Sequence, residues 1–315
     1  MRWQNKVFAA GMLASLSGCG DGGGGGRVDC GAAIARTPGS PQIFVGAGDI
    51  AGSWAQDEAT AQLLDDVVNT ATDPVTVFTA GDNVYPDGTL AQFTAFYQPT
   101  WGRHKGRTSP APGNHDYNTA GAQGYFDYFC AAAGPAGRGY YSYNLGNWHV
   151  VSLNSSADRV AASAQEQWLR NDLATSPAPC TLAYWHYSRF SSGALHGGDA
   201  SMDALFRALY AYGVDVLITG HDHIYERFDP QNPDADADPD GIRAFVVGTG
   251  GAALYGIGTV QANSVARNGA NTPNPSHGLL KLTLYDDRYD WEFIPTVSGG
   301  FTDSGSASCF TGTHP

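Results

Sequence analysis

Short apolar runs that end in glycine or a polar residue recur along the chain. Four of them are rich in β-branched and aromatic residues: Gln42–Gly48, Val75–Gly81, Thr181–His186 and Val214–Gly220. Continuous apolar runs of this length are typical of strands that are buried on both faces, as in parallel sheets. The pattern therefore predicts four core strands in an α/β protein.

Stretches with helical periodicity lie between these strands, and each follows a residue suited to cap a helix. A serine or threonine at the N-cap accepts a hydrogen bond from a free backbone N–H group, and Glu or Gln three residues later completes a capping box. Three positions have this box and the fourth has the serine alone: Ser53, Thr89, Ser163 and Ser201. The sequence predicts a helix after each of them.

Other segments have the alternation and the turn residues of antiparallel strands. Tyr140–Asn154 and Gly278–Pro295 each predict a hairpin, the second with its turn at Asp286–Arg288. Ile242–Thr249 adds a further strand. No break in composition divides this region, so we expect one domain over residues 41–315, with mixed sheets and outer helices.

The first residues are typical of a secretory signal, because two basic residues precede an apolar run that is too short to span a membrane. The tetrapeptide LSGC at residues 16–19 resembles the lipobox of bacterial lipoproteins. We expect residues 1–18 to be a lipoprotein signal peptide, Cys19 to carry lipid, and residues 19–40 to form a glycine-rich tether. The exported protein would be anchored to a membrane, facing the periplasm or the cell exterior. A plain cleaved signal is the alternative.

Acidic residues outnumber basic ones, 30 against 17. Residues 1–18 hold two basic and no acidic residues, so the chain without them has 15 basic residues and a net charge of −15. A protein of this charge repels nucleic-acid backbones and anionic membrane surfaces. We therefore expect no nucleic-acid partner, and no obligate protein partner is evident.

Four cysteines remain when Cys19 is set aside, an even number that suits disulfides in an oxidising compartment. Four cysteines allow three pairings. We expect Cys30–Cys309 to tie the two ends of the chain together and Cys130–Cys180 to bridge two loops.

Side chains that bind metals follow several of the predicted strands. They are Asp49, Asp82, Asn114, His115, Asp116, His186, His221 and His223. Ligands of α/β sheets bind beyond the carboxyl ends of the strands, where these side chains would converge. His221 and His223 point to the same side of an extended chain, so they can reach two metals about 3.5–4 Å apart. A single strand-end aspartate is more often a turn or helix cap, and the prediction of a metal site rests on the whole set.

Two other patterns have weaker support. Residues 46–51, GAGDIA, match a variant of the dinucleotide-binding fingerprint, but the next strand places its acidic residue, Asp82, beyond the expected distance. Asp234–Gly241 partly matches a calcium loop, but Val247 stands where the chelating glutamate belongs and Pro239 interrupts it. We expect a solvated acidic loop there.

Five motifs occur in order between residues 49 and 227: GDIA, GDNVY, GNHD, YWH and GHDHIYER. Together they resemble the motif blocks of the calcineurin-like metallophosphoesterases. The tyrosine of GDNVY and the final YER resemble the purple acid phosphatases within that superfamily. The resemblance implies an α/β fold, a four-layer αββα sandwich with two mixed β-sheets flanked by helices. The chain departs from the pattern at GDIA, where many members have a glycine that here follows one place later, at Gly52.

The resemblance also implies a role for each motif residue. Fe3+ would occupy the first metal site, bound by Asp49, Asp82, Tyr85 and His223. Fe2+, Zn2+ or Mn2+ would occupy the second, bound by Asp82, Asn114, His186 and His221. Asp82 would thus bridge the metals, and Tyr85 would bind as a phenolate. His115 would lie near the phosphoryl group, and His196 is a second candidate substrate histidine on its spacing from His186 alone.

The expected function is hydrolysis of a small phosphomonoester by attack of metal-activated hydroxide, as in acid phosphatases. A dinuclear centre suits this reaction because it neutralises an anionic ester and lowers the pKa of bound water. A phosphodiesterase on the same metals is one alternative. A non-catalytic lipoprotein that binds phosphate or metal at the cell surface is another.

Overall fold

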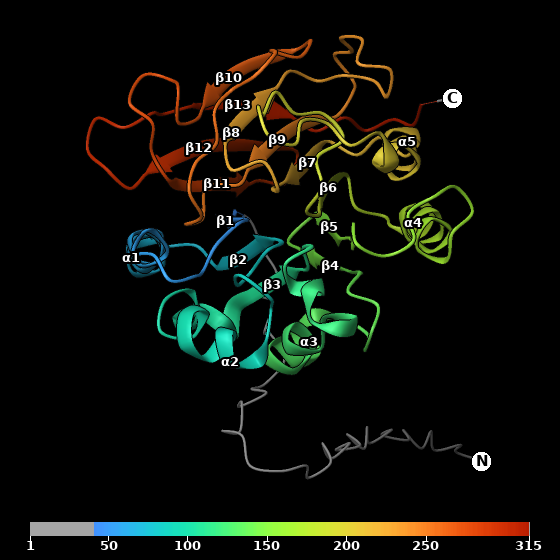
Figure 1. Ribbon diagram of the computed structural model, residues 1–315. Helices are drawn as coiled ribbons and strands as arrows, with labels where there is room; N and C mark the ends of the chain where they lie inside the picture. The colour runs from blue at the N-terminus through green and yellow to red at the C-terminus, as the bar shows by residue number, and fades with distance from the viewer. Residues whose placement is uncertain (1–40, 315) are drawn as a thin grey trace, which may run out of the picture.

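The computed structural model describes residues 41–314. One of its two sheets has six strands in the order β13-β12-β11-β1-β2-β3 (Figure 1). The strand bounds are β1 Gln42–Ala47, β2 Val75–Ala80, β3 Thr108–Ala111, β11 Gly278–Leu284, β12 Arg288–Pro295 and β13 Ser304–Ser308. The three strands β1, β2 and β3 are parallel, and β11, β12 and β13 extend the sheet through antiparallel pairings, β11 with β1 and then each with the strand before it.

The other sheet has seven strands in the order β10-β8-β9-β7-β6-β5-β4. Their bounds are β4 Tyr141–Leu145, β5 Trp148–Ser152, β6 Cys180–Tyr184, β7 Val216–Thr219, β8 Tyr225–Phe228, β9 Arg243–Val247 and β10 Ser264–Asn268. The strands β5, β6, β7 and β9 are parallel, while β4 pairs antiparallel with β5, β8 with β9, and β10 with β8. Both sheets are therefore mixed, as the sequence predicts.

Helices flank the two sheets, with α1 to α3 on one side of the molecule and α4 and α5 on the other (Figure 1). Their bounds are α1 Gln56–Thr70, α2 Leu90–Gln92, α3 Gln123–Phe129, α4 Ala164–Thr175 and α5 Asp203–Ala211. A π-helical turn and several 3-10 turns complete the list: Phe93–Tyr97, Trp101–Arg107, Asp116–Asn118, Ala120–Ala122, Cys130–Ala133 and Ala200–Met202.

Alternate residues of β6 show why the layers form. Tyr184 lies 5.7 Å from Phe44 of the other sheet, measured between ring centroids, so this face of β6 packs between the sheets. Ala183 and Trp185 point the opposite way, into the cluster that contains Leu169 of α4 and other residues of α4 and α5. Successive side chains of a strand face opposite sides, and here both sides are apolar and covered. The result is the expected four-layer αββα sandwich.

The predicted helix starts are only partly right. Thr89 forms a complete capping box with Gln92, and the Ser163 side chain accepts from the N–H of Glu166. Ser53 caps nothing, because α1 begins two residues later than the box requires, with Ala55 at its N-cap. Ser201 is also not a cap: it donates its N–H to Asp199, which caps the 3-10 turn before α5.

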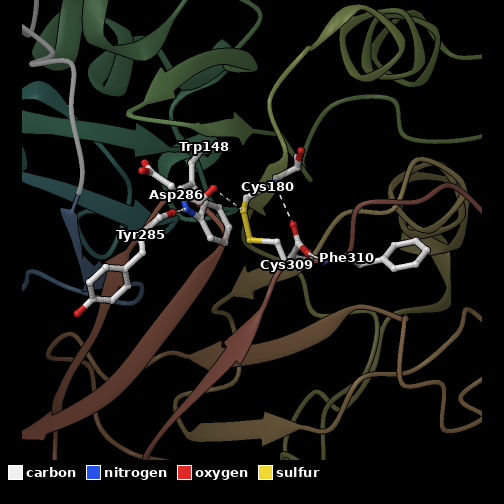
Figure 2. The surroundings of a disulfide bond; sticks show 8 residues. Trp148, Cys180, Tyr285, Asp286, Cys309 and Phe310 are labelled. Carbon is white, nitrogen blue, oxygen red and sulfur yellow. Dashed lines mark hydrogen bonds between the residues drawn. A yellow bond between two sulfur atoms is a disulfide. The ribbon is translucent and has the colours of Figure 1, made fainter.

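The disulfide pairing differs from the expected one. Cys180, at the start of β6, is bonded to Cys309, which follows β13, with their Cα atoms 5.5 Å apart (Figure 2). The expected pairs Cys30–Cys309 and Cys130–Cys180 are therefore wrong. Asp215 explains the meeting of the two cysteines, because its carboxylate accepts from the N–H groups of the residues that follow both of them. Order along the chain does not reveal such a contact.

None of the helices within residues 41–314 is long and apolar enough to cross a membrane. The predicted signal peptide, the predicted lipid attachment at Cys19, and Cys30 lie outside the described residues.

Candidate metal centre

The side chains expected at the strand ends lie together. Asp49, Asp82 and Asn114 follow the parallel strands β1, β2 and β3, while His186 and His221 follow β6 and β7 of the other sheet. The two sets face each other across the sandwich and meet at one edge of it. Three of these residues have a left-handed backbone, with φ of 61° at Asp49, 49° at Asp82 and 70° at His221. Non-glycine residues seldom adopt this conformation, and it concentrates at functional sites.

One half of the cluster is centred on Tyr85. Its hydroxyl lies 2.9 Å from Asp49 Oδ1, 3.0 Å from Asp82 Oδ2 and 3.2 Å from His223 Nε2. The tyrosine side chain is buried, with only 9% of its surface exposed. A phenol has one proton, so it can donate to only one of these three neighbours.

The other half is centred on His186. Its Nε2 atom lies 3.3 Å from Asp82 Oδ2 and 3.1 Å from Asn114 Oδ1. Ligand-type atoms of His221, His186 and Asp82 all lie within 4.8 Å of one another. Asp82 belongs to both halves, so its single carboxylate joins the two groups of side chains.

The orientation of the His186 and His223 imidazole rings tests whether cations fit between the side chains of this cluster. Nδ1 of His186 lies 2.8 Å from a backbone carbonyl oxygen, and Nδ1 of His223 lies 2.9 Å from another. A carbonyl oxygen only accepts, so each Nδ1 donates its proton there. Each Nε2 lone pair then faces a carboxylate oxygen 3.3 Å away. This arrangement requires a cation, either a second proton on the ring or a metal ion.

The spacing of the donor atoms suits a metal ion. Two ligands at about 2.0–2.2 Å from one cation, at right or tetrahedral angles, lie roughly 3–3.5 Å apart. The contacts around Tyr85 and His186 fall between 2.9 and 3.3 Å. The mixture of carboxylate, phenol, amide and imidazole donors fits borderline transition metals. Seven side chains therefore fit two metal ions that share Asp82. They are Asp49, Asp82, Tyr85, Asn114, His186, His221 and His223.

Burial and neighbouring charges shift the pKa values of the ionisable side chains of the cluster in different directions. Burial alone would raise the pKa of Asp49 and of Asp82, but the neighbouring histidines outweigh it and hold both below the usual value. Burial would lower the pKa of His186, but the two carboxylates outweigh it and raise it to about 9. Burial and the charge of His186 lower the pKa of His221 to about 3. Burial, followed by both carboxylates, raises the pKa of the Tyr85 phenol well above its usual value.

Glycines allow the two halves to approach. A Cβ atom at Gly81 would lie 2.6 Å from the His186 side chain, and the residue has a φ of 83°. A Cβ at Gly113 would lie 2.2 Å from Asp82 Oδ1. Only glycine lets the backbone pass this close to the two side chains.

The two candidate substrate histidines lie at the flanks of the cluster. The His115 ring packs against Tyr85, with centroids 4.2 Å apart, and its Nδ1 donates to the carbonyl of Pro86, 2.6 Å away. Its Nε2 lies 4.0 Å from Asp82 Oδ2. His196 is exposed and stacks on His221 with centroids 4.0 Å apart. Both rings thus border the buried cluster without belonging to it.

Asp222, in the middle of GHDH, is a supporting residue that the sequence analysis missed. Its buried carboxylate accepts from Ser191 Oγ at 2.6 Å and from the backbone N–H groups of His196 and Gly197 at 3.2 and 3.0 Å. It therefore fixes the loop that carries His196. An acidic residue between two candidate ligands is the signal that could have identified it.

Tyr255 is a second missed residue. Its ring stacks on His223 with centroids 3.9 Å apart and lies 5.7 Å from the ring of His196. It follows the glycine-rich end of β9, so glycines after a buried strand were the available signal.

The two weaker patterns do not form the sites they resemble. A dinucleotide fingerprint opens a helix, whereas α1 begins at Gln56, five residues after GAGDIA ends. In the acidic loop, Asp234 pairs with Arg207 and Asp238 accepts from the Tyr210 hydroxyl. These two carboxylates are engaged by the surface of α5.

Comparison with known proteins identifies the family of this chain. The sequence matches the calcineurin-like phosphoesterase family over residues 41–225, more than half of the chain. It is 36% identical over 117 residues to purple acid phosphatase 15 of Arabidopsis thaliana, a match that covers 36% of this chain and 22% of that protein. It is 27% identical over 175 residues to an acid phosphatase of Aspergillus ficuum, covering 49% of this chain and 28% of that protein. The chain thus spans about a quarter of the length of these relatives.

Solved structures show the same fold. A purple acid phosphatase from yellow lupin seeds superposes with a TM-score of 0.73 at 19% identity, covering 88% of this chain and 55% of that one. GAP50, the anchor in the inner membrane complex of Plasmodium, superposes with a TM-score of 0.67 at 14% identity, covering 85% and 89%. The ordered motifs, the sandwich and the family match agree, and the chain belongs to the calcineurin-like phosphoesterase family.

Proposed function

We propose that this chain is a dinuclear-metal phosphatase that hydrolyses phosphomonoesters. The observation that carries the proposal is the single carboxylate of Asp82, which lies within 3.0–3.3 Å of both Tyr85 and His186. Two groups of ligand-type side chains joined by one carboxylate are what a pair of metal ions requires. The similarity to acid phosphatases supports the choice of reaction.

Family membership implies two metal ions. We propose that the first is Fe3+, held by Asp49, Asp82, Tyr85 and His223. We propose that the second is Fe2+, Zn2+ or Mn2+, held by Asp82, Asn114, His186 and His221. When bound, the two ions would neutralise the phosphate ester and supply an activated water at neutral or acidic pH. The low pKa of the two aspartates and of His221 supports the assignment, because carboxylates and neutral imidazoles are the ligand forms.

His115 and His196 would act on the substrate. The Nδ1 proton of His115 is committed to the Pro86 carbonyl, so its Nε2 is the atom left to contact a phosphoryl oxygen. His196 is exposed beside the proposed second-metal ligand His221. From these flanks the two rings can stabilise developing charge and hand a proton to the leaving alkoxide.

A comparison of chromogenic substrates tests this function. Metal-replete protein is expected to hydrolyse p-nitrophenyl phosphate faster than bis-p-nitrophenyl phosphate, and His115→Ala is expected to lose 10²- to 10⁴-fold of the monoester rate. His314→Ala is the matched control. His314 stacks on Tyr210 and lies beside the Asp240 carbonyl, and neither residue is a proposed metal ligand or substrate contact. A preference for the diester would favour a phosphodiesterase, and no hydrolysis would favour a binding protein.

The location of the protein is also a proposal. The signal-like residues 1–18 and the LSGC sequence support an exported lipoprotein that is held at a membrane by lipid on Cys19. Metabolic labelling with a tagged fatty acid would test it, since Cys19→Ala is expected to abolish the label.

A further inference from the structure

A cavity of about 410 Å³ opens beside the metal centre and is not used by the proposed chemistry. Its walls include Trp54, Leu254, Pro275, Ala253, Gln56 and His277, and none of its lining residues is Asp, Glu, Lys or Arg. The volume falls within the ~300–1,000 Å³ typical of small-molecule pockets. A dry cavity of ~150 Å³ already accommodates benzene.

The cavity shares its walls with the proposed first metal site. The Trp54 ring packs edge-on against Tyr85, with centroids 5.2 Å apart. On the neighbouring wall, the carbonyl of Ala253 accepts from Nδ1 of His223 at 2.9 Å. The backbone N–H of Ala252 donates to the carbonyl of Asp49, also at 2.9 Å. Three of the four proposed ligands of this metal therefore contact a cavity wall or the residue next to it.

The aromatic wall is held in place by local contacts. The Trp54 indole N–H donates to the Ile50 carbonyl at 3.0 Å, and its ring covers Gly52, where a Cβ would lie 2.5 Å from ring atoms. The ring is half-buried, so part of it faces solvent. A fixed, partly exposed indole is a suitable surface for stacking a planar apolar group.

We propose that this cavity is a subsite for the organic part of the substrate, and that it favours phosphate monoesters of uncharged aromatic or apolar alcohols. This inference rests on the proposed function, which places the phosphoryl group at the metals. A lining without Lys or Arg offers no cationic side chain to a second phosphate or a carboxylate, whereas Trp54 and Leu254 gain by covering an apolar group.

Binding of non-hydrolysable phosphonates by the metal-loaded protein tests the subsite without requiring turnover. Phenylphosphonate and methylphosphonate carry the same anionic group and differ in the part that the cavity would hold. Calorimetric titration is expected to show that wild type binds phenylphosphonate roughly tenfold more tightly. Trp54→Ala and Leu254→Ala are each expected to reduce that preference at least threefold. Their affinity for methylphosphonate is expected to stay within twofold of wild type.

Val160→Ala is the matched control, because this valine is 59% exposed and does not line the cavity. Leu254→Ala changes the same cavity wall while leaving in place the Trp54 ring, which packs against Tyr85. Equal wild-type affinity for the two phosphonates, or a preference that both variants retain, would overturn the subsite. If wild type hydrolyses no monoester but shows the Trp54-dependent preference, the proposed function fails, while the cavity remains a binding site for the apolar group of a phosphonate.

Discussion

Asp82 is the residue that both halves of the site share. Its neighbour His186 is the group for which a proton and a metal ion compete. With no metal bound, Asp82 and Asp49 raise the pKa of the His186 imidazole to about 9, although burial opposes this. Below that pH the ring carries a second proton, whose place a metal ion would take. Because its pKa is about 9, the ring releases this proton when a metal ion binds at any pH below that value.

Metal uptake by the apoprotein at pH 7 is therefore expected to release protons, and apparent affinity is expected to rise as pH increases toward 9. Calorimetry of Zn2+ binding in buffers of different ionisation enthalpy measures the number of protons released. His186→Gln is expected to release about one proton fewer, whereas His314→Ala should release as many as wild type. Binding without proton release in wild type would contradict the account.

Tyr85 gives an optical test of the metal assignment. Its phenol has a pKa well above the ordinary value without metal, so ionisation at neutral pH requires a strongly acidic cation such as Fe3+. The iron-loaded protein is expected to absorb visible light through the phenolate–iron bond, and Tyr85→Phe to lose that band. Tyr212→Phe, at the C-cap of α5, serves as the control. Iron-loaded wild type without the band would show that Tyr85 is not an iron ligand.

Loop 191–197 shows how two buried carboxylates position a functional element. Asp222 and Glu226, both within the GHDHIYER motif, accept hydrogen bonds from this loop at Ser191 and at the Ser192 N–H. Gly193 lies against the first of them, where an added Cβ would be 2.2 Å from the Asp222 carboxyl carbon. The loop can hold this position only while that space stays empty.

Gly193→Ala is expected to destabilise the fold by about 1–3 kcal/mol through overpacking, and to lower kcat for monoesters by displacing His196. Thermal melting and steady-state kinetics measure the two effects. Gly106→Ala is the matched control, because a Cβ there meets nothing within 4 Å and the residue has no positive φ. If Gly193→Ala behaves like Gly106→Ala in both measurements, the loop is not held as described.

Elements with a strong apolar pattern could be predicted from the sequence, and those without it could not. The core strands β1, β2, β6 and β7 are apolar runs, and all four occur within two residues of their predicted limits. The edge strand β13, Ser304–Ser308, consists of serine, glycine and alanine, so nothing in its sequence distinguishes it from a loop. Its pairing with β12 depends on tertiary contacts.

The candidate site follows the same division. Residues directly after core strands, such as Asp49 and His221, could be identified because the ends of parallel strands converge. Tyr255 and Trp54 act through contacts between loops that are distant in sequence, and no local pattern encodes those contacts. The predicted cysteine pairs were wrong for the same reason.

At the scale of the whole molecule, the Cys180–Cys309 disulfide connects the two sheets. It links the start of β6 in one sheet to the residue after β13 in the other, across 129 residues of sequence. Closing a loop of this length restricts the unfolded chain, and removal of such bonds typically costs about 2–5 kcal/mol. The paired variant Cys180→Ser/Cys309→Ser is therefore expected to melt several degrees lower than wild type.

The same variant is expected to keep its metal content and its turnover at low temperature, because the bond lies away from the metal centre. Differential scanning calorimetry measures the melting temperature, metal analysis measures the metal content, and a phosphatase assay at low temperature measures the turnover. Ser304→Ala/Ser306→Ala, two changes in the neighbouring strand β13, control for disturbance of that edge. An unchanged melting temperature would show that the disulfide does not contribute to stability.

The central claim is that Asp82 and the six other proposed ligands around it hold two metal ions. Elemental analysis of purified, metal-replete protein tests it most directly, with Asp82→Ala as the variant and Asp66→Ala, an exposed aspartate of α1, as the control. Wild type and Asp66→Ala are expected to contain two metal ions per chain, and Asp82→Ala at most one with no phosphatase activity. Fewer than one ion in wild type, or two in Asp82→Ala, would contradict the account.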